Sequence, residues 1–513
     1  MPLTCQPVSS IGLFLFVLLC IGCGTADRTG SPGGRSCDFG WRPGHPPPSC
    51  REGDARWWSV FADDARIGWR VVGSRQGSRG RTICEERKMA IGRGRTAVEI
   101  SSVTQVEEDP DGRVVSFAST TDSNGTLERR CGKRTGARMQ VTTVVGDAVS
   151  TADIPWPGDA FVDGLQTGPL ARCLREPGHH CTLHAFDATT GKMARNHYVL
   201  KAMAPLPGWK APVFKKVSVK EDVPGAPVST VWFDDRLVPV REELHTPQVR
   251  FEVRSTTREE ALQPLASIDL FSRFFIPAPR ELETLDRSAP LTFELAGTDG
   301  VAPTIIETDE QQVHCDGVVC RVTVTPRPIP PSPLCAGEVP AEVAPFLLPG
   351  PFVQSDAVEI CDFARRAADG GDAATATINL TRAISRHVSV RHLSSVYDSA
   401  LTVLRSGEGD CTEFALLAAA SLRALGCPSR VVNGIVFVSD DGRGHQRFFG
   451  AHAWTQFWQD GRWYSMDAAF GHFDATHIAL EVHDGSPSSG TSAMLGILSG
   501  LKVVSVRTSI LPP

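Results

Sequence analysis

A succession of short β-type segments, which begins at Trp57 and continues through the first half of the chain, constrains the fold more than any other sequence feature. Residues 58–61 and 67–72 flank Asp63-Asp64, a pattern typical of a β-hairpin. Similar runs of Val, Thr and aromatic residues recur with turn residues between them, and no repeat of fixed length is apparent. We therefore predict a mostly antiparallel β domain over residues 56–325, which is long enough for two subdomains.

The pattern changes after a proline-rich segment. Residues 326–333 contain five prolines, and from Ser355 onward apolar residues recur with the spacing of amphipathic helices. We interpret residues 326–350 as a linker, residues 351–485 as a second, helix-containing domain, and residues 486–513 as a tail with a final strand. A helical domain that follows a β domain makes the expected fold class α+β.

The first residues have the pattern of an export signal. Residues 11–21 form an apolar run that is too short to cross a bilayer comfortably, and the run ends at Gly22-Cys23. This end resembles a bacterial lipobox, although Cys20 stands where Leu is usual and no Lys or Arg precedes the run. We predict a signal peptide over residues 1–22, a lipid on Cys23 and a Pro- and Gly-rich tether over residues 23–55. The protein would then be a membrane-anchored lipoprotein outside the cytoplasm. The alternative is an uncleaved N-terminal anchor.

Export would make the fifteen cysteines of the chain informative. An oxidising compartment favours disulfides, although spacing alone does not determine which cysteines pair. Pairing nearest neighbours is the simplest scheme. It joins Cys37 to Cys50 and Cys335 to Cys361, and it leaves Cys427 over. Because Cys427 follows an apolar helix, we predict that it is a buried and unreactive free thiol.

Composition argues against several kinds of partner. The net charge of -6 is small for 513 residues and gives no reason to expect a nucleic-acid partner. The histidines in residues 179–184 and 472–483 fit no standard zinc spacing, and no acidic calcium loop is visible. We therefore expect neither a metal nor a cofactor.

The strongest functional pattern is a glycine-rich turn, residues 406–410, that opens into an apolar stretch. This stretch predicts a buried helix that Gly426 and Pro428 end. Cys411 would lie at the N-terminus of the helix, where unpaired N–H groups and the helix dipole favour a thiolate. The alternative is a structural cysteine in the core or one half of a disulfide.

A hairpin near the C-terminus supplies a second pattern. Two aromatic-rich strands flank Asp460-Gly461, a strong two-residue turn signal. If these two residues form the turn, Gln459 faces Arg462, and His452 and Asp467 become diagonal neighbours on one face. This register predicts an imidazole oriented by a carboxylate. The alternative is a core histidine and an unrelated surface aspartate.

These patterns together resemble the transglutaminase core family, whose fold is similar to that of papain-like thiol proteases. The resemblance rests on Gly409–Glu413, on Pro428–Val432, on His452-Ala453-Trp454 and on Trp463 with Asp467, and it extends over about residues 356–481. It implies that Cys411 is the nucleophile, His452 the general base and acid, and Asp467 the residue that orients His452. Asp467 is followed by Ala468 where many members of the family have Pro, a departure that leaves the three proposed catalytic residues in place.

The resemblance implies an enzyme that acts on amide bonds of proteins or peptides through a thioester, either by transamidation or by hydrolysis. An alternative is a catalytically idle surface protein that kept the fold as a binding or scaffold module. A third possibility places the activity in the β domain, as a carrier of lipids or peptides.

Overall fold

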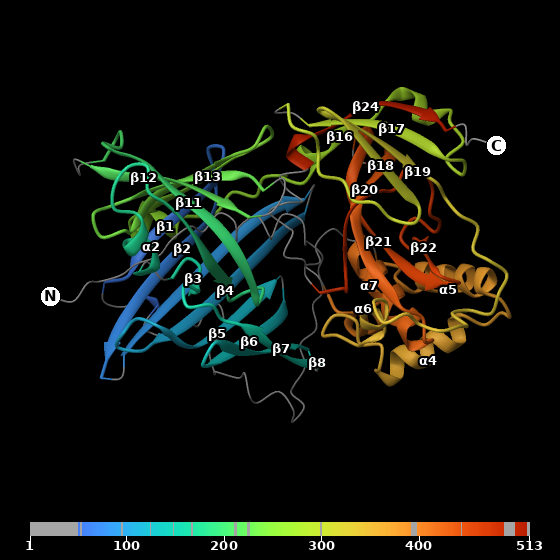
Figure 1. Ribbon diagram of the computed structural model, residues 1–513, viewed down its shortest axis with the longest axis horizontal. Coiled ribbons are helices and arrows are strands. Elements are labelled where there is room, and N and C mark those ends of the chain that lie inside the picture. The colour runs from blue at the N-terminus through green and yellow to red at the C-terminus, as the bar shows by residue number, and fades with distance from the viewer. Residues whose placement is uncertain are drawn as a thin grey trace. The chain divides into compact units, whose positions relative to one another are not determined.

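The computed structural model describes residues 50–51, 54–78, 80–93, 96–123, 125–146, 148–165, 168–209, 213–222, 226–297, 300–390, 398–442, 444–486 and 498–509. The predicted signal peptide, Cys23 and most of the predicted tether lie outside these residues. The chain forms two compact units that divide after Leu270 (Figure 1). The described residues are mostly β-strand, and helices α4 to α7 all lie in the second unit.

The first unit consists of strands β1 (Arg56–Ala62), β2 (Ala65–Gly77), β3 (Gly80–Arg93), β4 (Thr96–Glu108), β5 (Val114–Ser123), β6 (Thr126–Thr135), β7 (Arg138–Val145), β8 (Ala148–Pro155), β9 (Phe161–Val162), β10 (His180–Asp187), β11 (Lys192–Ala204), β12 (Phe214–Glu221), β13 (Val228–Phe233), β14 (Pro239–His245) and β15 (Arg250–Thr256), with the short helices α2 (Gly168–Cys173) and α3 (Arg258–Ala261).

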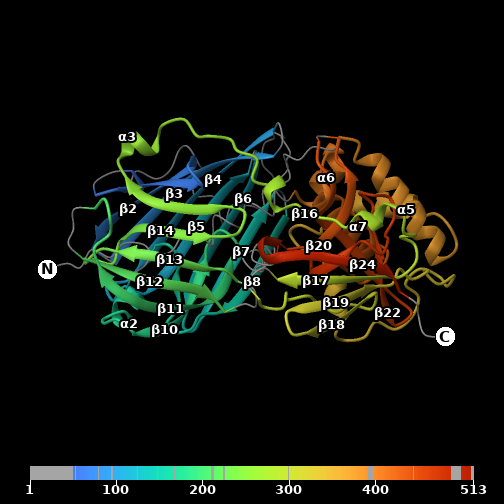
Figure 2. The ribbon, with the colours of Figure 1, turned by 90° about the horizontal axis from the view of Figure 1, so that it is seen from above.

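These strands form one 15-stranded sheet in the order β8 to β1 followed by β15 to β9. Consecutive strands pair in antiparallel fashion, as the alternation of strand and turn residues predicts. The exceptions are β9 with β10, which pair in parallel, and β8 with β9, which lie at opposite ends of the strand order. β1 pairs with both β2 and β15 and thereby joins the two halves of the sheet. Figure 2 shows β10 to β14 side by side. The prediction of a large antiparallel β region is confirmed.

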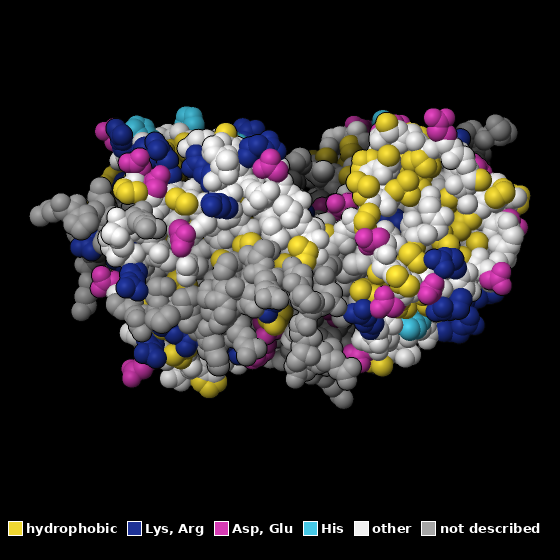
Figure 3. Space-filling model, turned by 90° about the horizontal axis from the view of Figure 1, so that it is seen from below, with side chains coloured by type: hydrophobic (Ala, Val, Ile, Leu, Met, Phe, Trp, Pro, Cys, Tyr) yellow, Lys and Arg dark blue, Asp and Glu magenta, His cyan; other side chains and the backbone are white. Residues whose placement is uncertain are grey.

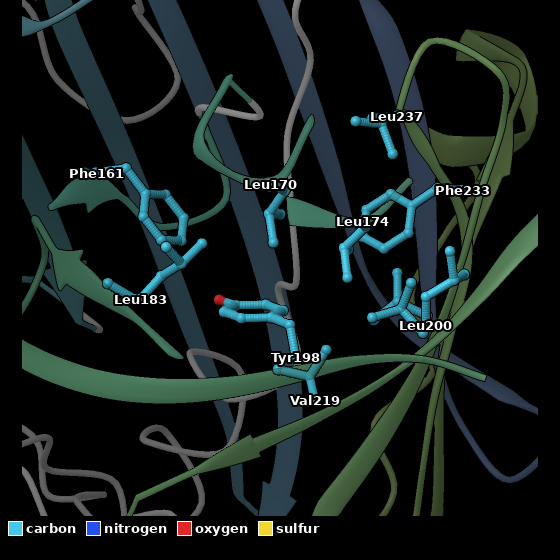
Figure 4. Close-up of a cluster of buried hydrophobic side chains, with 12 residues drawn as sticks. Phe161, Leu170, Leu174, Leu183, Tyr198, Leu200, Val219, Phe233 and Leu237 are labelled. Atoms are coloured by element: carbon cyan, nitrogen blue, oxygen red, sulfur yellow. The ribbon is translucent and has the colours of Figure 1, made fainter. Parts of the chain in front are cut away.

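The core of this unit is apolar. Tyr198, Leu200 and Phe233 belong to a buried cluster with Phe161 and with Leu170 of α2 (Figure 4). The ring centroids of Phe117 on β5 and Phe186 on β10 lie 4.9 Å apart, so the two halves of the sheet also contact each other through aromatic side chains.

The second unit consists of β16 (Ile276–Pro277), β17 (Leu291–Gly297), β18 (Gln311–Asp316), β19 (Val319–Val324), α4 (Val358–Ala367), α5 (Ala373–His387), α6 (Ala400–Ser406), α7 (Cys411–Ala424), β20 (Ser429–Asp440), β21 (Gln446–Gln459), β22 (Arg462–Met466), β23 (Ile478–His483) and β24 (Leu501–Thr508), with the 3-10 helices η3 (Ser272–Phe274), η4 (Arg280–Glu283) and η5 (Ala344–Leu347).

Helix α7 is the centre of this unit. It packs against α4, α5 and α6 on one side and against β20 and β21 on the other. Most of its side chains are buried, as its apolar sequence predicts. β20 and β21 belong to a five-stranded sheet with β16, β22 and β23.

Strands β17 to β19 were expected in the N-terminal domain, but they lie in the second unit. The reason is that β17 pairs with both β19 and β24, the final strand of the chain. An alternating sequence predicts a strand without identifying its partner, so this pairing between distant segments had no local signal.

The proline-rich segment 326–350 is not a linker between the units. Cys335 forms a disulfide with Cys427, and its N–H donates a 2.6 Å hydrogen bond to Oε1 of Gln459. The prediction that Cys427 is a free thiol is therefore wrong. Residues 335 and 427 are 92 positions apart, and nearest-neighbour pairing cannot anticipate a contact that only the folded chain creates.

Three more disulfides lie within the described residues, and they join Cys50 to Cys84, Cys173 to Cys181 and Cys315 to Cys320. The first replaces the expected pair of Cys37 with Cys50. Cys361, the expected partner of Cys335, is not in a disulfide. Four disulfides are typical of proteins outside the cytoplasm. Among the described residues, no helix has the length and apolar character needed to cross a membrane.

Hydrophobic side chains are not confined to the interior. On the face drawn in Figure 3 they gather over the second unit. Exposed large hydrophobic residues of that unit include Leu348, Val358 and Phe470. Phe470 matters for the site described next.

Candidate active site

Cys411 is the first residue of α7, and the local sequence determines where the helix begins. The side chain of Asp410 accepts a 3.0 Å hydrogen bond from the N–H of Thr412, and the side chain of Glu413 accepts one of 2.9 Å from the N–H of Asp410. The Asp410 side chain also accepts from the N–H of Glu413, and this bond together with the one from Asp410 to Glu413 forms a capping box. Cys411 is partly buried and is not in a disulfide. Its position at the positive end of the helix dipole favours a thiolate.

Glu413 also ties this turn to the segment before α6. Its Oε1 accepts a 3.0 Å hydrogen bond from the N–H of Asp398. Burial raises the pKa of Glu413 well above its ordinary value, and the neighbouring charges of Asp410 and Asp398 raise it further. Gly409 fits closely, because a Cβ at its position would lie 2.5 Å from the Cβ of Glu413. The turn that presents Cys411 is therefore held from two sides.

A buried hydrogen bond connects α7 to the strand that carries His452. Oγ1 of Thr455 on β21 donates to the carbonyl oxygen of Ala415 over 2.9 Å. Ala415 lies one helical turn after Cys411, and Thr455 lies three residues after His452. This bond anchors the first turns of α7 against the same stretch of β21 that carries the histidine.

The hairpin of β21 and β22 has the predicted register. Gln459 faces Arg462, and the pairing continues to Thr455 opposite Met466. Asp460 and Gly461 both have positive φ, 48° and 80°, as a two-residue hairpin turn requires. This register brings His452 to Asp467, where the distance from Nε2 to Oδ2 is 2.8 Å.

Asp467 is buried and fully hydrogen-bonded. Its Oδ1 accepts hydrogen bonds from the N–H groups of Ala469, at 2.7 Å, and Phe470, at 3.1 Å. Its Oδ2 accepts from His452 and from a second histidine, His477, whose Nε2 is 3.1 Å away. Burial alone would raise the pKa of Asp467, but His452 and His477 outweigh it and hold this pKa well below its ordinary value. Asp467 is therefore a carboxylate in the folded protein.

Sequence reasoning missed His477 as a partner of Asp467. It weighed His472, Asp474, His477 and His483 as metal ligands, and although residues 470–478 also resemble bacterial members of the transglutaminase core family, it gave His477 no role beside Asp467. In the structure, Nδ1 of His477 lies 3.1 Å from Oδ1 of Asp474, whereas His472 is exposed. The available local signal was the sequence Asp-Ala-Thr-His, in which Asp474 accepts hydrogen bonds from Thr476 and turns the chain.

His452, Asp467 and His477 also lie close enough to share a metal ion, because their ligand atoms are within 4.8 Å of one another. We do not assign them as metal ligands. The 2.8 and 3.1 Å distances are those of hydrogen bonds, and Oδ2 of Asp467 already accepts two of them.

The arrangement leaves one nitrogen of His452 for chemistry. Nε2 donates to Asp467, whereas Nδ1 makes no hydrogen bond within the part of the chain that the structure describes. The ring of Phe470 lies 4.8 Å from that of His452, and Phe470 is 45% exposed, so the buried imidazole lies close to the protein surface. An imidazole with one nitrogen held by a carboxylate can exchange a proton through the other.

The model of the transglutaminase-like superfamily matches residues 362–468, and this segment contains Cys411, His452 and Asp467. No curated protein matches the chain. A solved protein from Cytophaga hutchinsonii, described as "a putative cysteine protease", is 15% identical, with a TM-score of 0.29 over 43% of this chain and 84% of that one. A β-barrel-like protein of DUF1849 from Brucella abortus is 11% identical, with a TM-score of 0.30 over 40% of this chain and 96% of that one. Residues 362–468 of the second unit are therefore similar to the transglutaminase-like superfamily.

Proposed function

We propose that the second unit is a thiol enzyme that acts on amide bonds. Cys411 is the nucleophile, His452 is the general base and acid, and Asp467 orients His452. The observation that carries this proposal is the 2.8 Å hydrogen bond from Nε2 of His452 to Asp467 in a domain whose central helix begins at Cys411. The combination of a thiol, an imidazole and a carboxylate is the general pattern of an activated nucleophile.

The reaction follows from these groups. Nδ1 of His452 takes the proton of the Cys411 thiol, and the thiolate attacks the carbonyl carbon of an amide. The tetrahedral intermediate collapses when His452 returns the proton to the leaving amine, so the C–N bond breaks and a thioester remains on Cys411. Water then yields a carboxylic acid, and a primary amine yields a new amide. His452 takes a proton from either acceptor and returns it to the Cys411 sulfur as the thioester breaks.

The negative oxygen of the intermediate needs hydrogen-bond donors. The N–H of Cys411, at the start of α7, is one donor suited to this role, because the first N–H groups of a helix have no partner within the helix. The substrates would be proteins or peptides. The helix and strands of the enzyme domain would have a papain-like arrangement.

Mass-mapped alkylation tests the proposal without knowledge of the substrate. Cys361 is the matched reference, because it is also partly buried and outside any disulfide, but it is the fourth residue of α4 and its thiol donates a 3.3 Å hydrogen bond to the carbonyl oxygen of Ser355. Iodoacetamide at neutral pH on non-reduced protein should label Cys411 at least about tenfold faster than Cys361. Equal rates would favour a catalytically idle scaffold. A screen of amide donors with and without a primary amine would then separate transamidation from hydrolysis.

We also propose that the protein is exported and anchored through a lipid on Cys23. The apolar run before Gly22-Cys23 and the four disulfides support this. A single acyl chain binds membranes weakly, so stable attachment needs several chains. Cys23→Ser should release the protein from membrane fractions. An unmodified N-terminus on soluble wild-type protein would contradict the anchor and would leave the proposed chemistry intact.

A further inference from the structure

We propose that His477 is a positioning residue of this site, a buried imidazolium that holds Asp467 against His452 and offsets part of its negative charge. This inference rests on the proposed function of Cys411 and His452. It concerns a residue outside that triad and outside the segment matched by the family model.

The hydrogen bonds of His477 favour protons on both ring nitrogens. Nε2 lies 3.1 Å from Oδ2 of Asp467, and a carboxylate only accepts. Nδ1 lies 3.1 Å from both Oδ1 and the carbonyl oxygen of Asp474, which are two acceptors. One competing donor, the N–H of Asp474, lies farther away at 3.3 Å. Two carboxylates, one on each side of the ring, therefore favour the doubly protonated imidazolium.

The surroundings of His477 contain few other charges. The ring is 2% exposed and is covered by Trp454 and Phe473. The titratable groups that face it are Asp467, Asp474 and His452, and His472 lies at the outer side of Asp474, 3.9 Å away. Burial lowers the pKa of His477, but the hydrogen bonds and charges of the two carboxylates outweigh burial and raise it to about 9. The imidazolium thus persists at neutral pH.

The consequence for His452 is electrostatic as well as steric. The rings of His452 and His477 have centroids 5.6 Å apart and share one carboxylate oxygen. The positive charge that His477 carries at neutral pH opposes a second positive charge on His452. It therefore prevents Asp467 from holding the His452 proton too firmly for transfer to a leaving group.

The test measures the alkylation of Cys411 by iodoacetamide between pH 5 and 10, in full-length, non-reduced protein. His477→Gln keeps a donor for Asp467 but removes the charge. The pH of the alkaline inflection in the alkylation profile of Cys411 should then rise by about one unit or more. This is the order of effect expected between positive charges on His452 and His477, about 6 Å apart. His472→Gln is the matched control, because it changes an exposed histidine beside the same Asp474, and its profile should coincide with wild type.

A role of His477 in stability alone predicts a different result. His477→Gln would then unfold more easily but would keep the wild-type alkylation profile, and that outcome overturns the inference. Should His477→Gln fail to fold, Asp474→Asn removes the second carboxylate and should shift the inflection in the same direction. An unshifted profile in Asp474→Asn would overturn the inference too. Failure of the proposed function looks different, because wild-type Cys411 would react no faster than Cys361.

Discussion

Both units bury a small network of charges, and the two networks differ in what they can do. In the first unit, Glu85 is 1% exposed and accepts hydrogen bonds from Arg70 and Arg87. In the second unit, Asp467 is equally buried and accepts hydrogen bonds from His452 and His477. In each network, one buried carboxylate therefore accepts hydrogen bonds from two basic side chains.

The difference lies in the donors. Guanidinium groups keep their protons at any physiological pH, so the network around Glu85 can hold strands β2 and β3 together but cannot exchange a proton. Arg70 is further enclosed by the ring of Trp58, 5.2 Å from its guanidinium carbon. Imidazoles do exchange protons near neutral pH. Buried charge alone therefore does not identify a functional site, whereas a buried carboxylate that orients a histidine with a free nitrogen does.

The largest expected effect is a loss of enzyme turnover when the carboxylate of the second network is changed. Asp467→Asn should slow turnover by ~10³–10⁴-fold, because an amide neither stabilises an imidazolium nor enforces the correct tautomer. Turnover of an amide substrate from the screen, with circular dichroism as a check on folding, measures this. Near-normal turnover by a folded variant would mean that Asp467 has only a structural role.

The corresponding change in the first unit should affect stability and leave chemistry unchanged. Glu85→Gln removes the carboxylate that accepts hydrogen bonds from Arg70 and Arg87, and breaking this buried ion pair should cost about 3–5 kcal/mol of unfolding free energy. Urea denaturation measures this loss, and the alkylation rate of Cys411 in the folded variant should match wild type. A slower Cys411 would contradict the distinction drawn between the two networks.

The stability of the second network should fall at alkaline pH. The pKa of His477 is raised to about 9 in the folded protein, above its ordinary value of 6.5. Its contribution, of order 3 kcal/mol, is therefore complete below pH 6.5 and is lost as the pH rises through 9. Between pH 7 and pH 9.5, the urea concentration at the midpoint of unfolding should fall more for wild type than for His477→Gln. Equal falls in both proteins would argue that His477 is already neutral at pH 7.

The smallest expected effect compares two buried hydroxyl groups. Thr455→Val removes the hydrogen bond to Ala415, and Thr104→Val removes a buried 3.0 Å bond to Ser119 in the first unit. Each should lower the unfolding free energy by about 1 kcal/mol. Only Thr455→Val should also slow alkylation of Cys411, because only that bond anchors α7 to β21. Equal alkylation rates in the two variants would remove this bond from the list of contacts that position the site.

Patterns in a few adjacent residues were sufficient to predict two parts of the site. A glycine-rich turn before an apolar run predicted α7 and placed Cys411 at its start, since helix termini are encoded in a few adjacent residues. The Asp460-Gly461 turn predicted the register of β21 with β22, since a tight turn determines every pair in its hairpin. The contact of His452 with Asp467 followed from that register.

Contacts between residues that are distant in the sequence could not be predicted from such local patterns. His477 lies ten residues after Asp467, across a turn whose path depends on the hydrogen bonds of Asp467 and Asp474. The disulfide of Cys335 with Cys427 and the pairing of β17 with β24 join still more distant segments. Periodicity identifies elements in each case, but it contains no information about which distant element will be the partner.

The sequence by itself determined the residue types, the start of the central helix, the hairpin register and thus the candidate nucleophile, base and orienting carboxylate. Only the tertiary structure decided that Asp467 serves two histidines and that Cys427 is bonded to a proline-rich segment. The physical reason is range. Helix caps and tight turns act over a few residues, whereas a buried charge network and a disulfide require that folding first bring distant side chains into contact.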